Sequence, residues 1–262
     1  ATTEIYTLSL HDALPICEAW MFLRPAGFLD IKVGRQVLTW GTGDLVFLND
    51  LFPKDWQSFF IGRDAEYLKA PSDSVKVSLF SDLLNADFVF TPLFASDRFI
   101  TGQYVSYWNG ALGRLAGNES ELDFDKPDQW FTDAEYAARL YRTVGAYELA
   151  LYGYFGFWKN PGGIAACGEY IFPRLHVYGA SARGPVAGGI GNIEVAYYDS
   201  IDDPGGRDPN INNSEMRYLV GFAREISRDF NGSVQYYVEQ LLDYHNYRMR
   251  FDGSQPRDEL RH

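Results

Sequence analysis

Apolar and polar side chains alternate along much of this chain with a period of two residues, the spacing that separates the two faces of an extended strand. Near the beginning, Leu29, Ile31 and Val33 share one phase, whereas Asp30 and Lys32 share the other. The alternation predicts about ten amphipathic strands, in the ranges 18–24, 28–44 (its first half), 74–82, 86–94, 135–143, 147–158, 174–179, 192–198, 215–222 and 234–239.

The connections between these strands are alternately short and long. Turns of a few residues join the strands in pairs, and the pairs are separated by long polar stretches in the ranges 40–71, 95–133, 159–172 and 199–213. Short connections force neighbouring strands to pair antiparallel. A soluble sandwich or propeller has no reason to lengthen every second connection, whereas outer-membrane barrels have tight turns at one end and long loops at the other. We therefore predict an all-β, antiparallel up-and-down transmembrane β-barrel.

Composition and charge agree with this fold class. The chain has 262 residues, a net charge of −12, 46% hydrophobic residues and 16% aromatic residues. The acidic balance argues against a nucleic-acid partner, because binding to phosphates needs a basic surface. No apolar run approaches the ~18 residues of a membrane-spanning helix, so the choice lies between a soluble β-rich protein and a membrane barrel.

The first sixteen residues, ATTEIYTLSLHDALPI, stand apart from this pattern. They resemble, residue for residue, the translation of a common sequencing adapter, and we expect residues 1–16 to be foreign to the protein. On that interpretation, residues 17–262 are a barrel fragment that has lost N-terminal strands. The C-terminus is a second candidate for truncation. About ten strands would then remain, in an incompletely closed wall.

In a barrel, the apolar phase of each strand faces lipid and the charged phase lines the lumen. Charges keep to one phase within most strands, as expected if Arg or Lys facing mid-bilayer lipid costs roughly 2–4 kcal/mol. Tyr and Trp gather near strand ends, as in interfacial girdles; these are Trp40, Tyr141, Tyr147, Trp158, Tyr170, Tyr197 and Tyr198. The predicted pore-lining residues are Asp30, Lys32, Arg35, Lys76, Asp87, Glu135, Arg139, Glu148, Arg174, Glu194, Glu215, Arg217 and Glu239. Their mixed signs suit either the passage of polar solutes or ion pairs that merely stabilise the wall.

Arg35 needs a separate argument. Strict alternation from Leu29 would direct Arg35 toward lipid. We expect a bulge at Gly34 that shifts the register, turns Arg35 into the lumen, and turns Leu38 and Trp40 outward.

The strand that contains Gly34-Arg35-Gln36, followed by Trp40-Gly41-Thr42-Gly43-Asp44, resembles a group of Gram-negative outer-membrane porin-like proteins. Alginate-export-like porins carry a similar GRQ strand. The motif is short, but the hairpin rhythm that supports it extends from Cys17 to Asp243. The resemblance implies a monomeric or homo-oligomeric barrel in the bacterial outer membrane. Such a barrel moves small polar solutes or oligosaccharides, and nothing in the motif specifies a substrate.

Other chemistry has little support in the sequence. The two cysteines do not have the spacing of a metal site, so we predict no bound metal and no cofactor. No Ser or Asp is tied to His176 or His245 by a catalytic motif, so we predict no enzymatic activity. Gly41-Thr42-Gly43 is interpreted as a turn rather than a phosphate loop. The acidic segments 123–128 and 202–203 lack the spacing of a calcium loop and are interpreted as solvated. The alternative to a pore is a soluble or surface β-rich protein that presents its long aromatic loops to a glycan.

Overall fold

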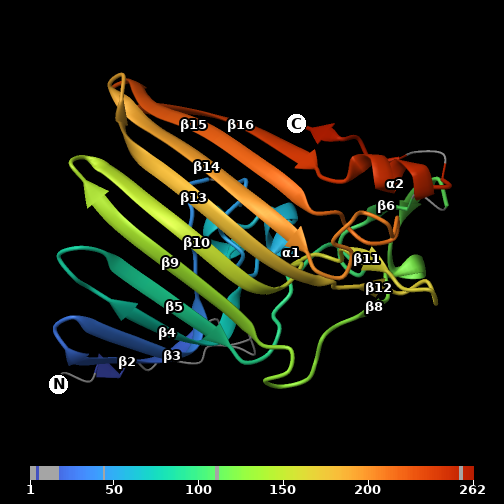
Figure 1. Ribbon diagram of the computed structural model, residues 1–262, viewed down its shortest axis with the longest axis horizontal. Helices are drawn as coiled ribbons and strands as arrows, with labels where there is room; N and C mark the ends of the chain where they lie inside the picture. The colour runs from blue at the N-terminus through green and yellow to red at the C-terminus, as the bar shows by residue number, and fades with distance from the viewer. Residues whose placement is uncertain (1–3, 6–17, 44, 110–111, 254–255) are drawn as a thin grey trace.

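The chain forms one large antiparallel sheet of twelve strands, seen in the computed structural model of Figure 1, which describes residues 4–5, 18–43, 45–109, 112–253 and 256–262. In spatial order the strands are β1 (Glu4–Ile5), β2 (Ala19–Ala26), β3 (Leu29–Val37), β4 (Pro71–Leu79), β5 (Asn85–Thr91), β9 (Glu135–Val144), β10 (Tyr147–Phe157), β13 (Arg174–Val186), β14 (Gly189–Ser200), β15 (Glu215–Ser227), β16 (Phe230–Leu241) and β17 (Leu260–Arg261). Each strand is hydrogen-bonded to the one that follows it in this list, so the order of the strands in the sheet follows their order in the sequence. The prediction of an all-β antiparallel meander is confirmed.

Short turns gather at one end of the sheet and long connections at the other, on the left and right of Figure 1. The long connections contain short elements of their own: α1 (Trp56–Phe60), η1 (Ala65–Leu68), β6 (Tyr107–Asn109), β7 (Arg114–Ala116), η2 (Asn118–Ser120), β8 (Phe124–Asp125), β11 (Gly163–Ile164), β12 (Tyr170–Ile171) and α2 (Tyr244–Arg250). β6 and β7 form a hairpin, and β11, β12 and β8 form a small sheet. No helix within the described ranges combines the length and apolar character needed to span a bilayer.

The large sheet is open. Within the described ranges, no pairing joins the β1–β2 side of the sheet to the β16–β17 side. The structure therefore has the strand order of the predicted barrel but not its closure. The adapter prediction for residues 1–16 lies outside the described residues, except for the backbone of β1.

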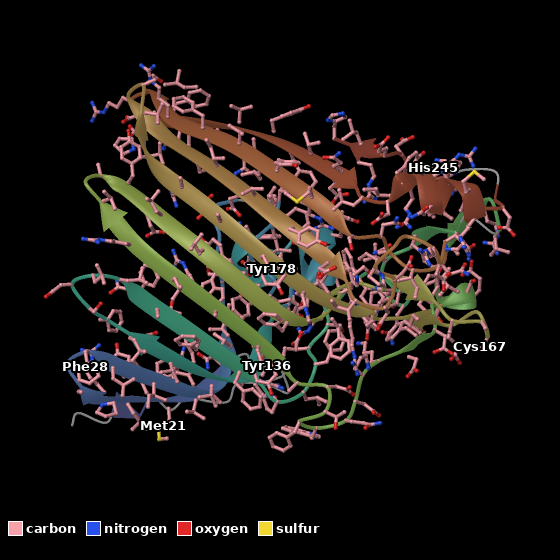
Figure 2. All side chains as sticks on the ribbon, viewed as in Figure 1. Met21, Phe28, Tyr136, Cys167, Tyr178 and His245 are labelled. Atoms are coloured by element: carbon pink, nitrogen blue, oxygen red, sulfur yellow. The ribbon has the colours of Figure 1, made fainter. Side chains whose placement is uncertain are left out.

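The two faces of the sheet carry opposite kinds of side chain. One face, the apolar face, exposes Met21, Tyr136 and Tyr178 to 43%, 53% and 47% (Figure 2). The opposite face, the covered face, carries ionisable groups such as Asp87 and Glu194, which are only 3% and 2% exposed. A sheet of an ordinary soluble domain buries its apolar face instead.

The segment 38–70, which runs from the end of β3 to β4, lies on the covered face and buries it. Leu48 packs among Tyr154, Val177, Tyr198 and Leu219 of the sheet. A second cluster joins three residues of the segment to three of the sheet: Leu38, Trp40 and Phe52 with Val89, Ala150 and Tyr152. The core therefore lies between the sheet and the segment 38–70, and α1 of that segment lies behind the sheet in Figure 1.

This packing corrects part of the predicted aromatic girdle. Trp40, Trp158 and Tyr198 are 8%, 6% and 1% exposed and belong to the covered-face core. A residue buried inside the protein cannot lie at a lipid–water interface. Trp158 and Tyr198 pack with Leu48 of the segment 38–70, and Trp40, which belongs to that segment, packs against Tyr152 of the sheet.

Candidate functional site

The strand register brings most of the predicted charged residues together on the covered face. Asp30, Asp87, Arg139, Arg217 and Glu239 lie in one continuous row across the strands, with Ser78, Tyr152, Gly179 and Ala196 between them. Regular alternation on the same strands puts the rest of the set on the same face: Lys32, Lys76, Glu135, Glu148, Glu194 and Glu215.

Two predicted residues lie on the apolar face instead. The register of β3 with both neighbours runs without a shift through Gly34, so no bulge forms there. Arg35 therefore shares the apolar face with Val33, where its guanidinium donates two hydrogen bonds, of 3.0 and 2.9 Å, to the carboxylate of Asp73. The expected outward turn of Leu38 and Trp40 is wrong for the same reason, because both are buried under the covered face.

Arg174 was predicted from the wrong phase of β13. It pairs with Phe157 and shares the face of His176 and Tyr178, two residues in ring contact with Phe155 of the apolar face. The sequence phase misled because Leu175 is apolar yet belongs to the covered face, where it is 1% exposed against the cluster around Leu48. The covered face is thus not uniformly polar; it is apolar where the segment 38–70 rests on it.

Most charges on the covered face are already paired. Arg139 contacts Glu148 at 2.6 Å, and Lys76 contacts Asp87 at 3.4 Å. Farther along, Arg217 and Arg261 share Glu215 and Glu239, with distances from 2.7 to 3.5 Å. This arrangement favours the interpretation in which ion pairs stabilise the wall and leave little net charge toward a ligand.

Glu194 is the exception, because it is buried without an ion-pair partner among the described residues. Its carboxylate accepts hydrogen bonds from the backbone N–H groups of Thr42 and Gly43, from the Thr42 hydroxyl at 2.7 Å, and from the Asn49 amide at 2.7 Å. The turn Gly41–Gly43 is therefore an anion-binding backbone turn whose anion is a side chain of the sheet. Glu194 anchors the segment 38–70 rather than facing a solute.

A second buried network joins the segment 38–70 to the next two long connections. The carboxylate of Asp97 accepts hydrogen bonds from the Lys54 backbone N–H at 2.8 Å, from Trp56 Nε1 at 3.0 Å and from Asn160 Nδ2 at 3.0 Å. The Lys54 ammonium contacts Asp50 at 3.0 Å. Burial raises the pKa of Asp97 above its ordinary value, and the hydrogen bond from Lys54 opposes that shift only in part.

At the beginning of β9, Lys159 contacts Glu135 at 2.5 Å, with side chains that are 9% and 5% exposed. The Tyr154 hydroxyl donates to the same carboxylate at 2.5 Å, and the Lys159 ammonium also donates to the carbonyl of Ala95 at 3.0 Å. Glu135 is therefore a structural junction between the sheet and the two connections that follow β5 and β10.

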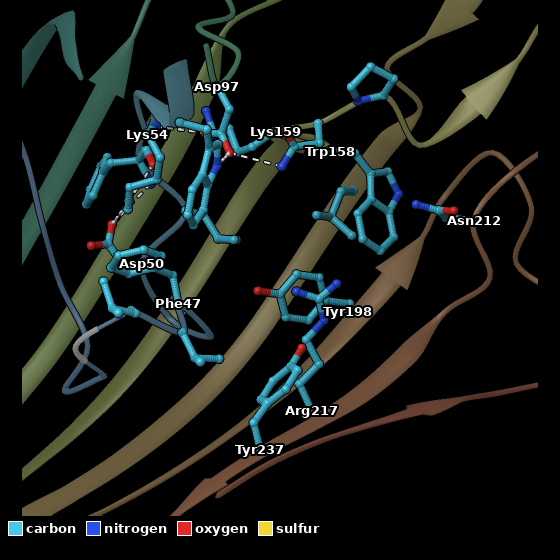
Figure 3. Close-up of a pocket in the computed structure, with 18 residues that line it drawn as sticks. Phe47, Asp50, Lys54, Asp97, Trp158, Lys159, Tyr198, Asn212, Arg217 and Tyr237 are labelled. Carbon is cyan, nitrogen blue, oxygen red and sulfur yellow. Dashed lines mark hydrogen bonds and ion pairs between the residues drawn. The ribbon is translucent and has the colours of Figure 1, made fainter. Parts of the chain in front are cut away.

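A cavity of about 340 Å³ opens between the segment 38–70 and the covered face; we call it the main cavity. At one end it is lined by Asp50, Lys54 and Asp97, and at the other by Arg217 lying 4.0 Å over the ring of Tyr198 (Figure 3). The remaining lining combines aromatic and amide side chains with aliphatic ones and with Lys159; it includes Phe47, Trp56, Trp158, Asn160, Asn212, Leu45 and Leu175. Such a lining can hold a small polar molecule between ring faces.

A second cavity, of about 460 Å³, lies among the long connections; we call it the loop cleft. Its lining contains no charged side chain and consists of Phe99, Tyr107, Trp108, Asn109, Leu122, Phe124, Pro161 and Tyr170. Pro161 also lines the main cavity, so the two cavities adjoin.

Sequence reasoning missed Asp97, Lys159 and both cavities. The relevant residues lie in long connections without a hydrophobic period, and no local signal indicates which of them meet. Within the described ranges, no group of three or more His, Cys, Asp and Glu side chains is arranged to hold a metal ion. Comparisons of the chain with protein-family models, with curated proteins and with solved structures returned no match.

Proposed function

We propose that the sheet is part of the wall of an outer-membrane β-barrel, with its apolar face in lipid and its covered face toward a passage for small polar solutes or oligosaccharides. The proposal requires that the two sides of the open sheet be paired in the functional assembly, by further strands or by other copies.

The observation that carries the proposal is the inverted exposure of the two faces. Leu151, Ile193, Val220 and Val234 are 59%, 57%, 53% and 66% exposed on four strands of the apolar face. Exposure of aliphatic surface costs about 25 cal/mol for each Å², and soluble monomers rarely carry a contiguous apolar patch larger than a few hundred Å². Lipid removes this cost, because the bilayer core is itself apolar.

The opposite face supports the role of a passage. Most of its ionisable groups are held in pairs, and the segment 38–70 leaves the main cavity between itself and the wall. A solute that crosses such a passage meets alternating charges and ring faces rather than a ladder of one sign. This arrangement favours neutral or weakly charged polar solutes over a single type of ion.

The test is to locate the apolar face directly. With Cys17 and Cys167 changed to Ser, a nitrobenzoxadiazole fluorophore is attached through Leu151→Cys on the apolar face or through Leu83→Cys, which is 72% exposed in a short turn. In lipid vesicles, we expect a lipid-borne spin label to quench the fluorophore at 151 and aqueous iodide to quench the one at 83. Quenching of both by iodide alone would refute the membrane assignment. Absence of ion conductance by the assembled protein in a planar bilayer would refute the passage.

The loop cleft favours a second candidate, a surface β-rich protein that binds glycans through its long connections. Trp108 in this cleft is 65% exposed. The same labelling experiment separates the two candidates, because a water-soluble glycan binder would show iodide quenching at both positions.

A further inference from the structure

The loop cleft is a preformed cavity rather than a gap between unconnected loops. β12 pairs with β8 through Tyr170 and Phe124, which fixes the two contributing connections relative to each other. The Tyr107 hydroxyl donates to the Ser120 carbonyl at 2.6 Å and accepts from the Asn109 amide at 3.1 Å. Side chains held in this way lose little conformational entropy when a ligand arrives.

The floor of the cleft rests on a buried aromatic cluster. The rings of Phe99 and Phe124 lie 5.1 Å apart, and both approach Phe172, at 6.1 and 6.4 Å. Phe172 in turn packs with Phe94 and Phe157 at the end of the sheet. The ring faces of the cleft are therefore supported by an aromatic cluster that is anchored to the end of the sheet at Phe157.

The lining is suited to a molecule that has apolar faces and a rim of hydroxyl groups. Ring faces of Tyr107, Trp108 and Tyr170 can stack on the C–H faces of a pyranose. The hydroxyl of Tyr170 and the indole N–H of Trp108 have no hydrogen-bond partner among the described residues, so both are available to ligand hydroxyls. No carboxylate lines the cleft, and the ammonium of Lys126 lies 4.8 Å from the centre of the Phe124 ring, which disfavours a quaternary ammonium ligand.

Two hydrogen-bond donors, from Asn212 and Trp158, lie at the part of the main cavity next to Pro161. Arg257 Nη1, which can only donate, contacts Asn212 Oδ1 at 2.8 Å, so the amide nitrogen of Asn212 must point the other way. That nitrogen is directed toward the indole of Trp158, whose Nε1 is buried without a partner (Figure 3). An oxygen atom placed between these two donors would satisfy both.

We propose that the loop cleft and the part of the main cavity next to Pro161 are two adjacent parts of one binding site for a neutral oligosaccharide. Because Pro161 lines both cavities, the two together offer room for more than one sugar ring. The inference rests on the proposed function in assigning the sugar as the transported solute, but binding itself is measured independently of any membrane passage.

The experiment is isothermal titration calorimetry of the full chain in detergent micelles, with maltotriose and cellotriose as neutral probes and choline and glucuronate as charged ones. We expect saturable binding of at least one trisaccharide and none of choline or glucuronate. Trp108→Ala should weaken this binding at least about tenfold. Tyr170→Phe, which keeps the ring and removes only the hydroxyl, should weaken it by a smaller factor.

The matched control is Trp130→Ala. Trp130 lies in the same connection, is 57% exposed and lines neither cavity, so its removal should leave the affinity unchanged. Binding of neither trisaccharide, or equal binding by the Trp108→Ala variant, would overturn the inference. Binding of choline or glucuronate alone would overturn the assignment of a neutral sugar. Conductance without sugar binding refutes this inference and leaves the proposed passage standing, whereas sugar binding without conductance does the reverse.

Discussion

The carboxylate of Glu194 should be the main anchor of the segment 38–70, and its removal should destabilise the protein more than removal of any exposed charge on the same face. The substitution is Glu194→Ala. In the folded protein Glu194 is 2% exposed and accepts hydrogen bonds from the backbone of Thr42 and Gly43 and from the side chains of Thr42 and Asn49.

The magnitude follows from the donors that would be left without an acceptor. The Thr42 hydroxyl can rotate to another partner, and already accepts from Asn192 at 2.9 Å, so it is not counted. Two backbone N–H groups and one N–H of the Asn49 amide remain, since the amide nitrogen also donates to the Ala180 carbonyl at 3.4 Å. Each costs about 1–3 kcal/mol when buried without a partner. Because Thr42 and Gly43 are half-buried and water can reach them, we take the lower end, about 3 kcal/mol in total.

The assay is urea unfolding in detergent micelles, followed by intrinsic fluorescence, together with trypsin cleavage at Lys54. The control is Glu148→Ala, which removes a carboxylate with a side chain that is 43% exposed and one ion pair, and should cost no more than about 1 kcal/mol. Glu194→Gln, which keeps the shape and loses the charge, should fall between the two. Equal unfolding free energies for Glu194→Ala and Glu148→Ala, with Lys54 still protected from trypsin, would refute the anchoring role.

Three further predictions concern charges in other environments. Burial raises the pKa of the Asp97 carboxyl group above 3.8, so the folded protein binds the carboxyl proton more tightly than the unfolded chain does. The unfolding free energy of the wild type, measured relative to that of Asp97→Asn, should therefore fall as pH rises from 3.8 through the raised pKa. A difference between the two proteins that does not change with pH would contradict this prediction. Lys159→Met should cost about 3–5 kcal/mol in urea unfolding by leaving Glu135 buried without its cation, and the double variant with Glu135→Gln should recover part of that loss. The double variant Arg35→Leu/Asp73→Leu should be at least as stable as the wild type in lipid vesicles, because charges that face lipid are costly; a marked loss of stability there would argue that this face meets water.

Strand positions and most faces could be predicted from the sequence because they are local properties. Alternation within β10 or β15 is fixed by a few neighbouring residues, and it correctly separated Glu148 from Leu149 and Arg217 from Val220. The segment 38–70 could not be placed in this way. Its anchor joins Thr42 to Glu194 across 152 positions, and neither residue carries a local sign of that contact. The wrong face assignment for β13 has the same cause. Its apolar residues, such as Leu175, lie on the covered face because the segment 38–70 packs there, and the local sequence does not indicate that contact.

Gly34 illustrates how a correct signal can have a different physical cause. A glycine beside an arginine in the middle of a strand suggested a bulge, but the register is regular and the glycine is needed for close approach of β2. Gly34 has φ +125°, and a Cβ at this position would lie 2.3 Å from the Ala19 carbonyl oxygen. Arg35 needs no bulge because β4 begins at Pro71, three residues before the predicted start at Ser74, and the extension brings Asp73 directly opposite the guanidinium. An error of a few residues at a strand end, which is common in any assignment of strands, therefore concealed the carboxylate that allows an arginine to remain on the apolar face.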